Sequence, residues 1–234
     1  MFNFSILFSY FFVTLVLIIV YLKYMKKSII LIHGLFMPSI VMKFMEKQFK
    51  NLGYSVHQFA YRTVKYSDHT LHQLDDLIKK INTEKLYLVG HSMGGLVSRQ
   101  YIEKFGINSH KDISVVTVGT PHYSSRLGKH LEKGILKIIF GTSGNSGITK
   151  ELPKWSEKVP MGCIAGEYPV GINHIFTKLV HKAPSDGTVF LDEAILDNCT
   201  DSVVVKSSHT GLVYSKNVVM QCHYFFDNLK FNKQ

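Results

Sequence analysis

The stretch Leu88–Ile102, LVGHSMGGLVSRQYI, most constrains the fold, because a short apolar strand passes directly into a helical pattern. Gly90, Ser92 and Gly94 occupy the turn between them. Small residues two positions before and after a serine let neighbouring backbones approach closely at a sharp turn. Such a turn holds the hydroxyl out from the sheet, beside the partly positive N-terminus of the next helix. The spacing Gly-x-Ser-x-Gly in this context predicts a nucleophile elbow at Ser92.

From residue 28 onward the chain alternates between apolar strand-like runs and amphipathic helices. Apolar residues at helical spacing predict helices over 42–53 and 69–82. Continuous apolar strands between helices indicate a parallel sheet that is covered on both faces. A chain of 234 residues suits one domain with a sizeable core. We therefore predict an α/β catalytic domain over residues 28–234, with about six mostly parallel strands. The strand-like runs are SIILIHG, YSVHQFAY, KLYLVG, DISVVTVGTPH, MGCIAGEY and DSVVVKSS.

Residues 2–22 contain no charged side chain, and a helix needs about 20 residues to cross a bilayer. A signal peptide would carry positive charge before its apolar run and a small-residue cleavage site after it. Here the charges, Lys23, Lys26 and Lys27, follow the run. We predict a single-pass, uncleaved membrane anchor over residues 1–27. Lysines on this flank favour a catalytic domain that faces the cytoplasm.

The formal net charge of +10 leaves the body of the chain basic. No DNA- or RNA-binding motif accompanies this charge, so an anionic membrane surface fits better than nucleic acid. Cys163, Cys199 and Cys222 lie far apart and form no C-x-x-C pair. This argues against a disulfide framework or a zinc site. We expect no metal, no cofactor, no nucleic-acid partner and no obligate protein partner.

The motif LIHGLF at residues 31–36 supplies a second element of the predicted site. Hydrolysis by a serine nucleophile needs backbone N–H donors that hold the oxyanion, one from the residue after the serine and one from the loop after an earlier strand. Met93 follows Ser92, and Leu35 follows the first core strand. The amides of Leu35 and Met93 are therefore the predicted oxyanion hole, although a plain strand-ending turn is an alternative for the first loop. The elbow and oxyanion loop together comprise His33, Gly34, Gly90, His91 and Gly94.

Four segments, LIHGL, LVGHSMGGLVSRQYI, VVTVGTPHYSSRLG and APSDGTVFLDEAIL, together resemble the α/β-hydrolase superfamily. The resemblance is closest to its lipase/esterase branch, which includes small triacylglycerol lipases and membrane-tethered lipid deacylases. It extends from about Ser28 to Leu229. No strand precedes SIILIHG, and in this respect the chain resembles the minimal six-stranded lipases.

The resemblance implies a catalytic triad in the order serine, acid, histidine. Ser92 needs a base to accept its proton, and the base needs a carboxylate that fixes its tautomer. Asp186 matches the family's Asp-Gly-x-Val segment, and His209 follows the last predicted strand, where the family places its histidine. A simple turn-forming role is the alternative for Asp186. The rival residues are Asp192 and Asp197 for the acid and His223 for the base.

Residues 123–160 interrupt the alternation and are predicted to form a cap. Their basic amphipathic stretch suits either a solvated cover or a lid that contacts a membrane. The resulting hypothesis is a membrane-anchored serine hydrolase that cleaves carboxylic esters, in particular lipid acyl esters, through an acyl-enzyme. A thioesterase or an acyltransferase would use the same triad, and a non-catalytic membrane scaffold would not need it.

Overall fold

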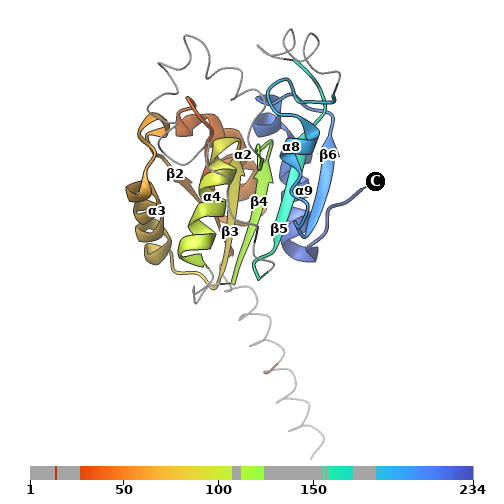
Figure 1. The fold of residues 1–234 in the computed structure, drawn as a ribbon. Helices are drawn as coiled ribbons and strands as arrows, with labels where there is room; N and C mark the ends of the chain where they lie inside the picture. Colours follow the sequence, from red (N-terminus) through yellow and green to blue (C-terminus); the bar gives the residue numbers. More distant parts are fainter. Residues whose placement is uncertain are drawn as a thin grey trace, which may run out of the picture.

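The computed structural model describes Thr14 and residues 27–106, 112–123, 155, 158–170 and 183–233. These residues build a sheet of six parallel strands in the order β2-β1-β3-β4-β5-β6 (Figure 1). The six-stranded α/β prediction is confirmed, and every strand pair is parallel. The strands are β1 (Lys27–Ile32), β2 (Ser55–Phe59), β3 (Lys85–His91), β4 (Asp112–Val118), β5 (Met161–Gly166) and β6 (Asp201–Val205).

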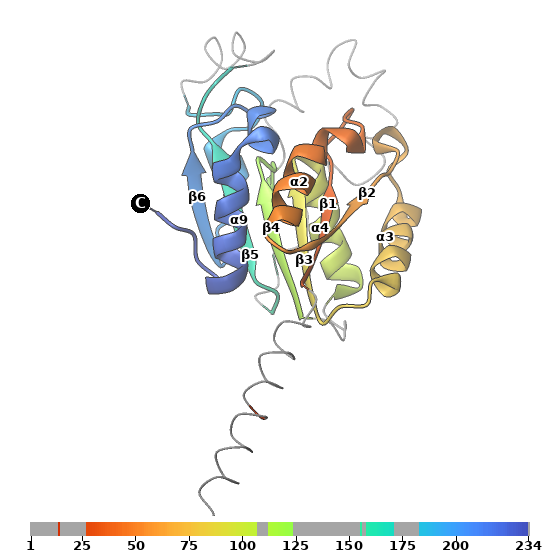
Figure 2. The ribbon, with the colours of Figure 1, turned by 180° about the vertical axis from the view of Figure 1, so that it is seen from behind.

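Helices cover both faces of the sheet, as Figures 1 and 2 show from opposite sides. Helices α3 (Asp68–Lys80) and α4 (Met93–Lys104) lie on one face with the short α8 (Leu191–Ala194). Helices α2 (Lys43–Asn51) and α9 (Lys216–Asn228) lie on the other. Short 3-10 turns connect these elements: η1 (Ser39–Met42), η2 (Thr63–Lys65) and η4 (Gly211–Tyr214).

Two apolar cores follow from the alternation of side chains along buried strands. Ile30 and Ile32 of β1 point to the core beneath α3 and α4. Ile29 and Leu31 point to the core shared with α2 and α9. Because both faces are covered, nearly every β1 residue must be apolar, and this explains the continuous hydrophobic run.

The sheet changes direction between β1 and β3. From β1 the chain moves outward to β2, whereas from β3 it moves the other way to β4. At such a switch point the loops after neighbouring strands diverge and leave a crevice at the carboxyl ends. Ile32 of β1 pairs with Gly90 of β3, so the loop after β1 meets the elbow after β3.

Two predicted segments fall largely outside the described residues. Of the expected anchor over residues 1–27, the structure describes only Thr14 and Lys27. Of the expected cap over residues 123–160, it describes only Tyr123, Trp155 and residues 158–160. Within the described part of the chain, no helix combines the length and apolarity that a membrane crossing requires.

Candidate active site

Ser92 lies in the turn between β3 and α4 with a strained backbone. Its φ is 54° and its ψ is −122°, a conformation that residues other than glycine rarely adopt. The N–H of Ser92 donates to the carbonyl of Val118 at 2.9 Å, which ties the turn to the end of β4. Strain of this kind persists only where surrounding contacts fix it, and it is typical of functional turns.

The glycines around Ser92 are required by close backbone packing. A Cβ on Gly90 would lie 2.5 Å from the carbonyl carbon of Gly94. A Cβ on Gly94 would overlap the carbonyl oxygen of Ile32 in β1. The helix can therefore begin directly against the strands only when both positions lack a side chain, which is the reason for the Gly-x-Ser-x-Gly spacing.

His209 and Asp186 are in direct contact. The His209 Nδ1 lies 2.7 Å from the Asp186 Oδ2, and the His209 backbone N–H donates to the Asp186 carbonyl at 2.9 Å. Asp186 is 1% exposed, and its Oδ1 accepts the N–H groups of Thr188 and Val189 at 2.9 and 2.7 Å. With Nδ1–H donating to the carboxylate, the Nε2 of His209 is left as a proton acceptor.

Asp186 therefore has both of the roles considered for its sequence motif. Its Oδ1 accepts the N–H groups that close the turn, and its Oδ2 contacts His209. Asp192 lies on α8, and the backbone N–H of Asp197 donates to the hydroxyl of Tyr123 at 3.1 Å. The rival base, His223, lies on α9 with its Nδ1 2.7 Å from the Tyr54 hydroxyl. Of the three carboxylates considered, Asp186 is the one paired with His209.

Two contacts bring the Asp186–His209 pair to the elbow. Gly119 follows β4 with a φ of +57°, and a Cβ there would lie 3.1 Å from Asp186 Oδ2 and 3.2 Å from His209 Nδ1. The Nε2 of His91, the residue before Ser92, lies 3.0 Å from the His209 carbonyl oxygen. The turn of Ser92 and the Asp186–His209 pair therefore lie together at the carboxyl edge of the sheet.

The loop after β1 lies directly against Ser92. A Cβ on Gly34 would lie 3.0 Å from the Cβ of Ser92, so the Gly34 backbone passes directly beside it. The amide N–H groups of Leu35 and Met93 donate to no acceptor in the described part of the chain. The next amide, that of Phe36, is occupied by the Thr63 hydroxyl at 3.2 Å. Both amides predicted to bind an oxyanion are therefore without an acceptor among the described residues.

His33 holds this loop in place. Its Nδ1 donates to the Gly34 carbonyl at 3.0 Å, and its Nε2 accepts the Tyr61 N–H at 3.4 Å. The Tyr61 ring stacks on His33 with centroids 4.6 Å apart, and its hydroxyl donates to the His33 carbonyl. Burial lowers the pKa of His33, which favours the neutral ring that these bonds require.

Tyr61 and Gly119 were not identified from the sequence. The positive φ of Gly119 could have been suspected from the Gly-Thr-Pro turn after a strand, whereas nothing local marks Tyr61. His122, three residues after Gly119, is buried, with its Nε2 3.0 Å from the Thr117 hydroxyl and 3.6 Å from the Cys163 thiol.

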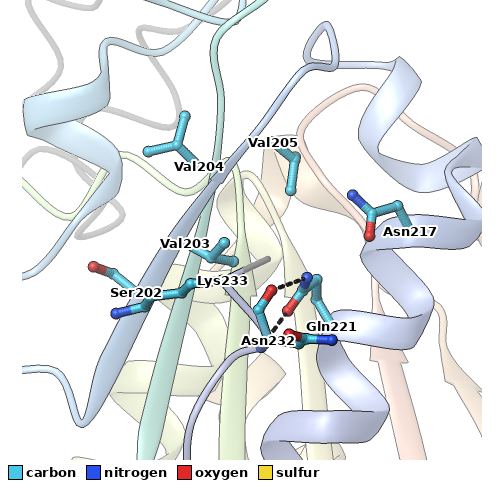
Figure 3. Close-up of a pocket in the computed structure, with 8 residues that line it drawn as sticks. All are labelled: Ser202, Val203, Val204, Val205, Asn217, Gln221, Asn232 and Lys233. Carbon is cyan, nitrogen blue, oxygen red and sulfur yellow. Dashed lines mark hydrogen bonds between the residues drawn. The ribbon is translucent and has the colours of Figure 1, made fainter.

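A polar cavity lies elsewhere, between the edge strand β6, helix α9 and the C-terminal segment (Figure 3). None of its lining residues belongs to the predicted site. The three cysteines are free thiols. Among the described residues, no three His, Cys, Asp or Glu side chains are arranged to hold a metal ion. The cavity residues are Ser202, Val203, Val204, Val205, Asn217, Gln221, Asn232 and Lys233.

Comparison with known proteins agrees with this geometry. The family model "Lipase (class 3)" matches residues 35–142, which include Leu35 and the turn around Ser92 but not Asp186 or His209. Over these residues the chain resembles the lipase and esterase branch of the α/β-hydrolases. Its enzyme class is carboxylic ester hydrolase. No curated protein matches the sequence significantly.

Solved structures share the fold of this chain at low sequence identity. A metagenomic carboxyl esterase has a TM-score of 0.70 at 13% identity, covering 87% of this chain and 76% of its own. A pyrethroid hydrolase from Sphingobium faniae has a TM-score of 0.55 at 12% identity, with 87% and 98% covered. Tomato methylketone synthase I has a TM-score of 0.54 at 14% identity, with 88% and 97% covered.

Proposed function

We propose that this α/β-hydrolase is a membrane-anchored serine hydrolase that cleaves acyl esters, including those of lipids. The observation that carries the proposal is the 2.7 Å contact between His209 and Asp186 beside the strained turn of Ser92. A free hydroxyl is a weak nucleophile at neutral pH and needs an adjacent base. In this arrangement the Nε2 of His209 carries no proton and can accept one. Asp186 holds the ring in that tautomer by accepting the Nδ1–H.

In the proposed reaction, the Oγ of Ser92 attacks the ester carbonyl carbon while the Nε2 of His209 takes the hydroxyl proton. The carbonyl oxygen becomes an oxyanion, which the amides of Leu35 and Met93 bind. The tetrahedral intermediate collapses to acyl-Ser92, and His209 returns its proton to the departing alkoxide. Water then attacks the acyl-enzyme with His209 as base, releasing the carboxylic acid and restoring Ser92.

A thioesterase and an acyltransferase are alternatives with the same residues. A thioester places a thiolate on the leaving side, and an acyltransferase admits an alcohol in place of water at the second step. A non-catalytic scaffold has no use for the buried Asp186–His209 pair, since the same turn could close without a histidine partner. Profiling with esters, thioesters and acceptor alcohols separates these functions.

The predicted anchor places the proposed site away from its own membrane. The sequence from residue 27 enters β1 at the amino edge of the sheet, whereas the site lies at the carboxyl edge (Figure 1). The six residues of β1 span about 20 Å at ~3.3 Å per residue. Residues 23–26 reach at most about 14 Å when fully extended. With β1 upright on the bilayer, the carboxyl edge that carries Ser92 would lie about 20 Å or more from the surface, and esters would reach it from the aqueous side.

The proposed function is tested on the full chain in detergent micelles. A fluorophosphonate probe and a chain-length series of p-nitrophenyl esters report nucleophile labelling and turnover. The wild type should label and turn over, and Ser92→Ala should do neither. Ser55→Ala, on the exposed surface of β2, is the matched control and should behave as wild type. Labelling of the Ser92→Ala protein at another residue would overturn the proposal.

A further inference from the structure

His91 is a second histidine in contact with the proposed base, and no step of the reaction uses it. It is 0% exposed and ends β3 directly before Ser92. Its Nε2 lies 3.0 Å from the backbone carbonyl oxygen of His209, and the two rings lie 4.7 Å apart at an angle of 46°. We infer that His91 is a positioning residue, which holds His209 in register with the nucleophile. The inference rests on the proposed function, since it acts through His209.

The chemistry of the contact fixes the state of the His91 ring. A carbonyl oxygen accepts only, so the Nε2 of His91 carries the proton and donates it. Its Nδ1 has no hydrogen-bond partner in the described part of the chain. Burial lowers the pKa of His91 to about 3; the charges of His209 and His33 act in the same direction, whereas the hydrogen bond to the His209 carbonyl acts against them. The ring is therefore a neutral donor throughout the pH range in which an esterase works.

His91 also lies against the loop that follows β1. A Cβ on Gly34 would lie 3.2 Å from the His91 Nδ1, so the ring fills the space between the oxyanion loop and His209. The backbone of His209 is then held at both of its polar groups: the N–H by the Asp186 carbonyl at 2.9 Å, and the carbonyl by His91. One ring thus ties the base to the strand that carries the nucleophile.

This role predicts an effect on the rate rather than on substrate binding. His91→Phe keeps a flat ring in the core but removes the donor, so the His209 segment loses one of its two restraints. Misplacement of a catalytic group by about 1 Å costs on the order of 10²-fold in rate. We expect kcat on p-nitrophenyl butyrate to fall by about this factor with KM within twofold. His91→Gln, which restores an N–H donor, should recover most of the loss.

His122→Phe provides the matched control. His122 is also buried, at 5% exposed, and its Nδ1 likewise has no partner among the described residues, but its ring contacts Thr117 and Cys163 rather than His209. The thermal unfolding midpoints of both phenylalanine variants show how much stability each substitution costs. The downfield proton resonance of the His209 Nδ1–H reports the contact with Asp186. It should shift or broaden in His91→Phe and remain unchanged in His122→Phe.

The outcomes separate this inference from the proposed function. An active Ser92→Ala protein would overturn the proposed function itself. An inactive Ser92→Ala protein together with a fully active His91→Phe protein would overturn the positioning role alone. Equal losses of kcat in the His91→Phe and His122→Phe proteins would also overturn it, because they would indicate general damage to the core. If His91→Phe does not fold, His91→Gln decides: near wild-type kcat supports the role of the donor, and loss of kcat with a native midpoint contradicts it.

Discussion

The substitution Asp186→Asn should greatly lower turnover while leaving the fold intact, because the two carboxylate oxygens make different contacts. The Oδ1 accepts the N–H groups of Thr188 and Val189, and an asparagine carbonyl oxygen can accept both. The Oδ2 faces the Nδ1 of His209 at 2.7 Å. An amide NH₂ in its place is a donor that faces a donor, so the His209 ring shifts its proton to Nε2. A protonated Nε2 cannot accept the hydroxyl proton of Ser92.

The expected magnitude follows from this loss of tautomer. In a serine triad the wrong tautomer lowers kcat by about 10⁴-fold, equivalent to ~5.5 kcal/mol of activation free energy. Asp186→Ala differs, because it also leaves the N–H groups of Thr188 and Val189 without their acceptor. A buried donor without a partner costs about 1–3 kcal/mol of stability. The alanine form should therefore lose both activity and stability, and the asparagine form activity alone.

Stopped assays with p-nitrophenyl butyrate and thermal unfolding of the same preparations check this prediction. Asp197→Asn, an exposed carboxylate, is the control and should keep both kcat and midpoint. Full activity of Asp186→Asn together with an inactive Asp192→Asn would refute the assignment of the acid and place that role on α8.

Three further predictions concern a glycine, a titration and the membrane. Gly119→Ala places an alanine at a φ of +57°, with its Cβ 3.1 Å from Asp186 Oδ2, so it should lower both the unfolding midpoint and kcat. Gly53→Ala has a φ of +87° but open space around the Cβ, so it should lower the unfolding midpoint only. Equal kcat for the two glycine variants would argue against Gly119 shaping the acid–base pair. Because the folded-state pKa of His91 is about 3 and the ordinary value is 6.5, the unfolded chain binds a proton between these values that the folded chain does not. Stability should therefore fall with pH below 6.5, by up to about 1.4 kcal/mol per pH unit from this group, and urea titrations of His91→Gln should show a shallower fall than wild type. In vesicles that carry the full chain, a soluble butyrate ester should be hydrolysed as fast as in detergent, and a fluorogenic ester lipid should react no faster in the same bilayer than in separate vesicles. Strong preference for the lipid of its own bilayer would contradict the orientation deduced from β1.

The sequence predicted the fold class because its signals are local. Strands buried on both faces must be apolar at nearly every position, as in β1, and covering helices carry an apolar stripe, so the alternation is visible without any long-range contact. The elbow is visible for the same reason: the glycines that permit its close packing lie within two residues of Ser92. Asp186 and His209 came from family resemblance, since neither carries a local mark that separates it from Asp192, Asp197 or His223.

Only the tertiary structure decided which distant segments meet. The parallel pairing of β1 with β3 sets Gly34 beside Ser92, and the left-handed turn at Gly119 makes room for Asp186 and His209. The part played by Tyr61 and by His91 depends on backbone carbonyls brought from 28 and 118 residues away. A sequence shows which side chains can donate a hydrogen bond. The acceptor in these two contacts is a main-chain carbonyl oxygen, which every residue possesses. Only the fold therefore determines which carbonyl oxygen accepts the hydrogen bond.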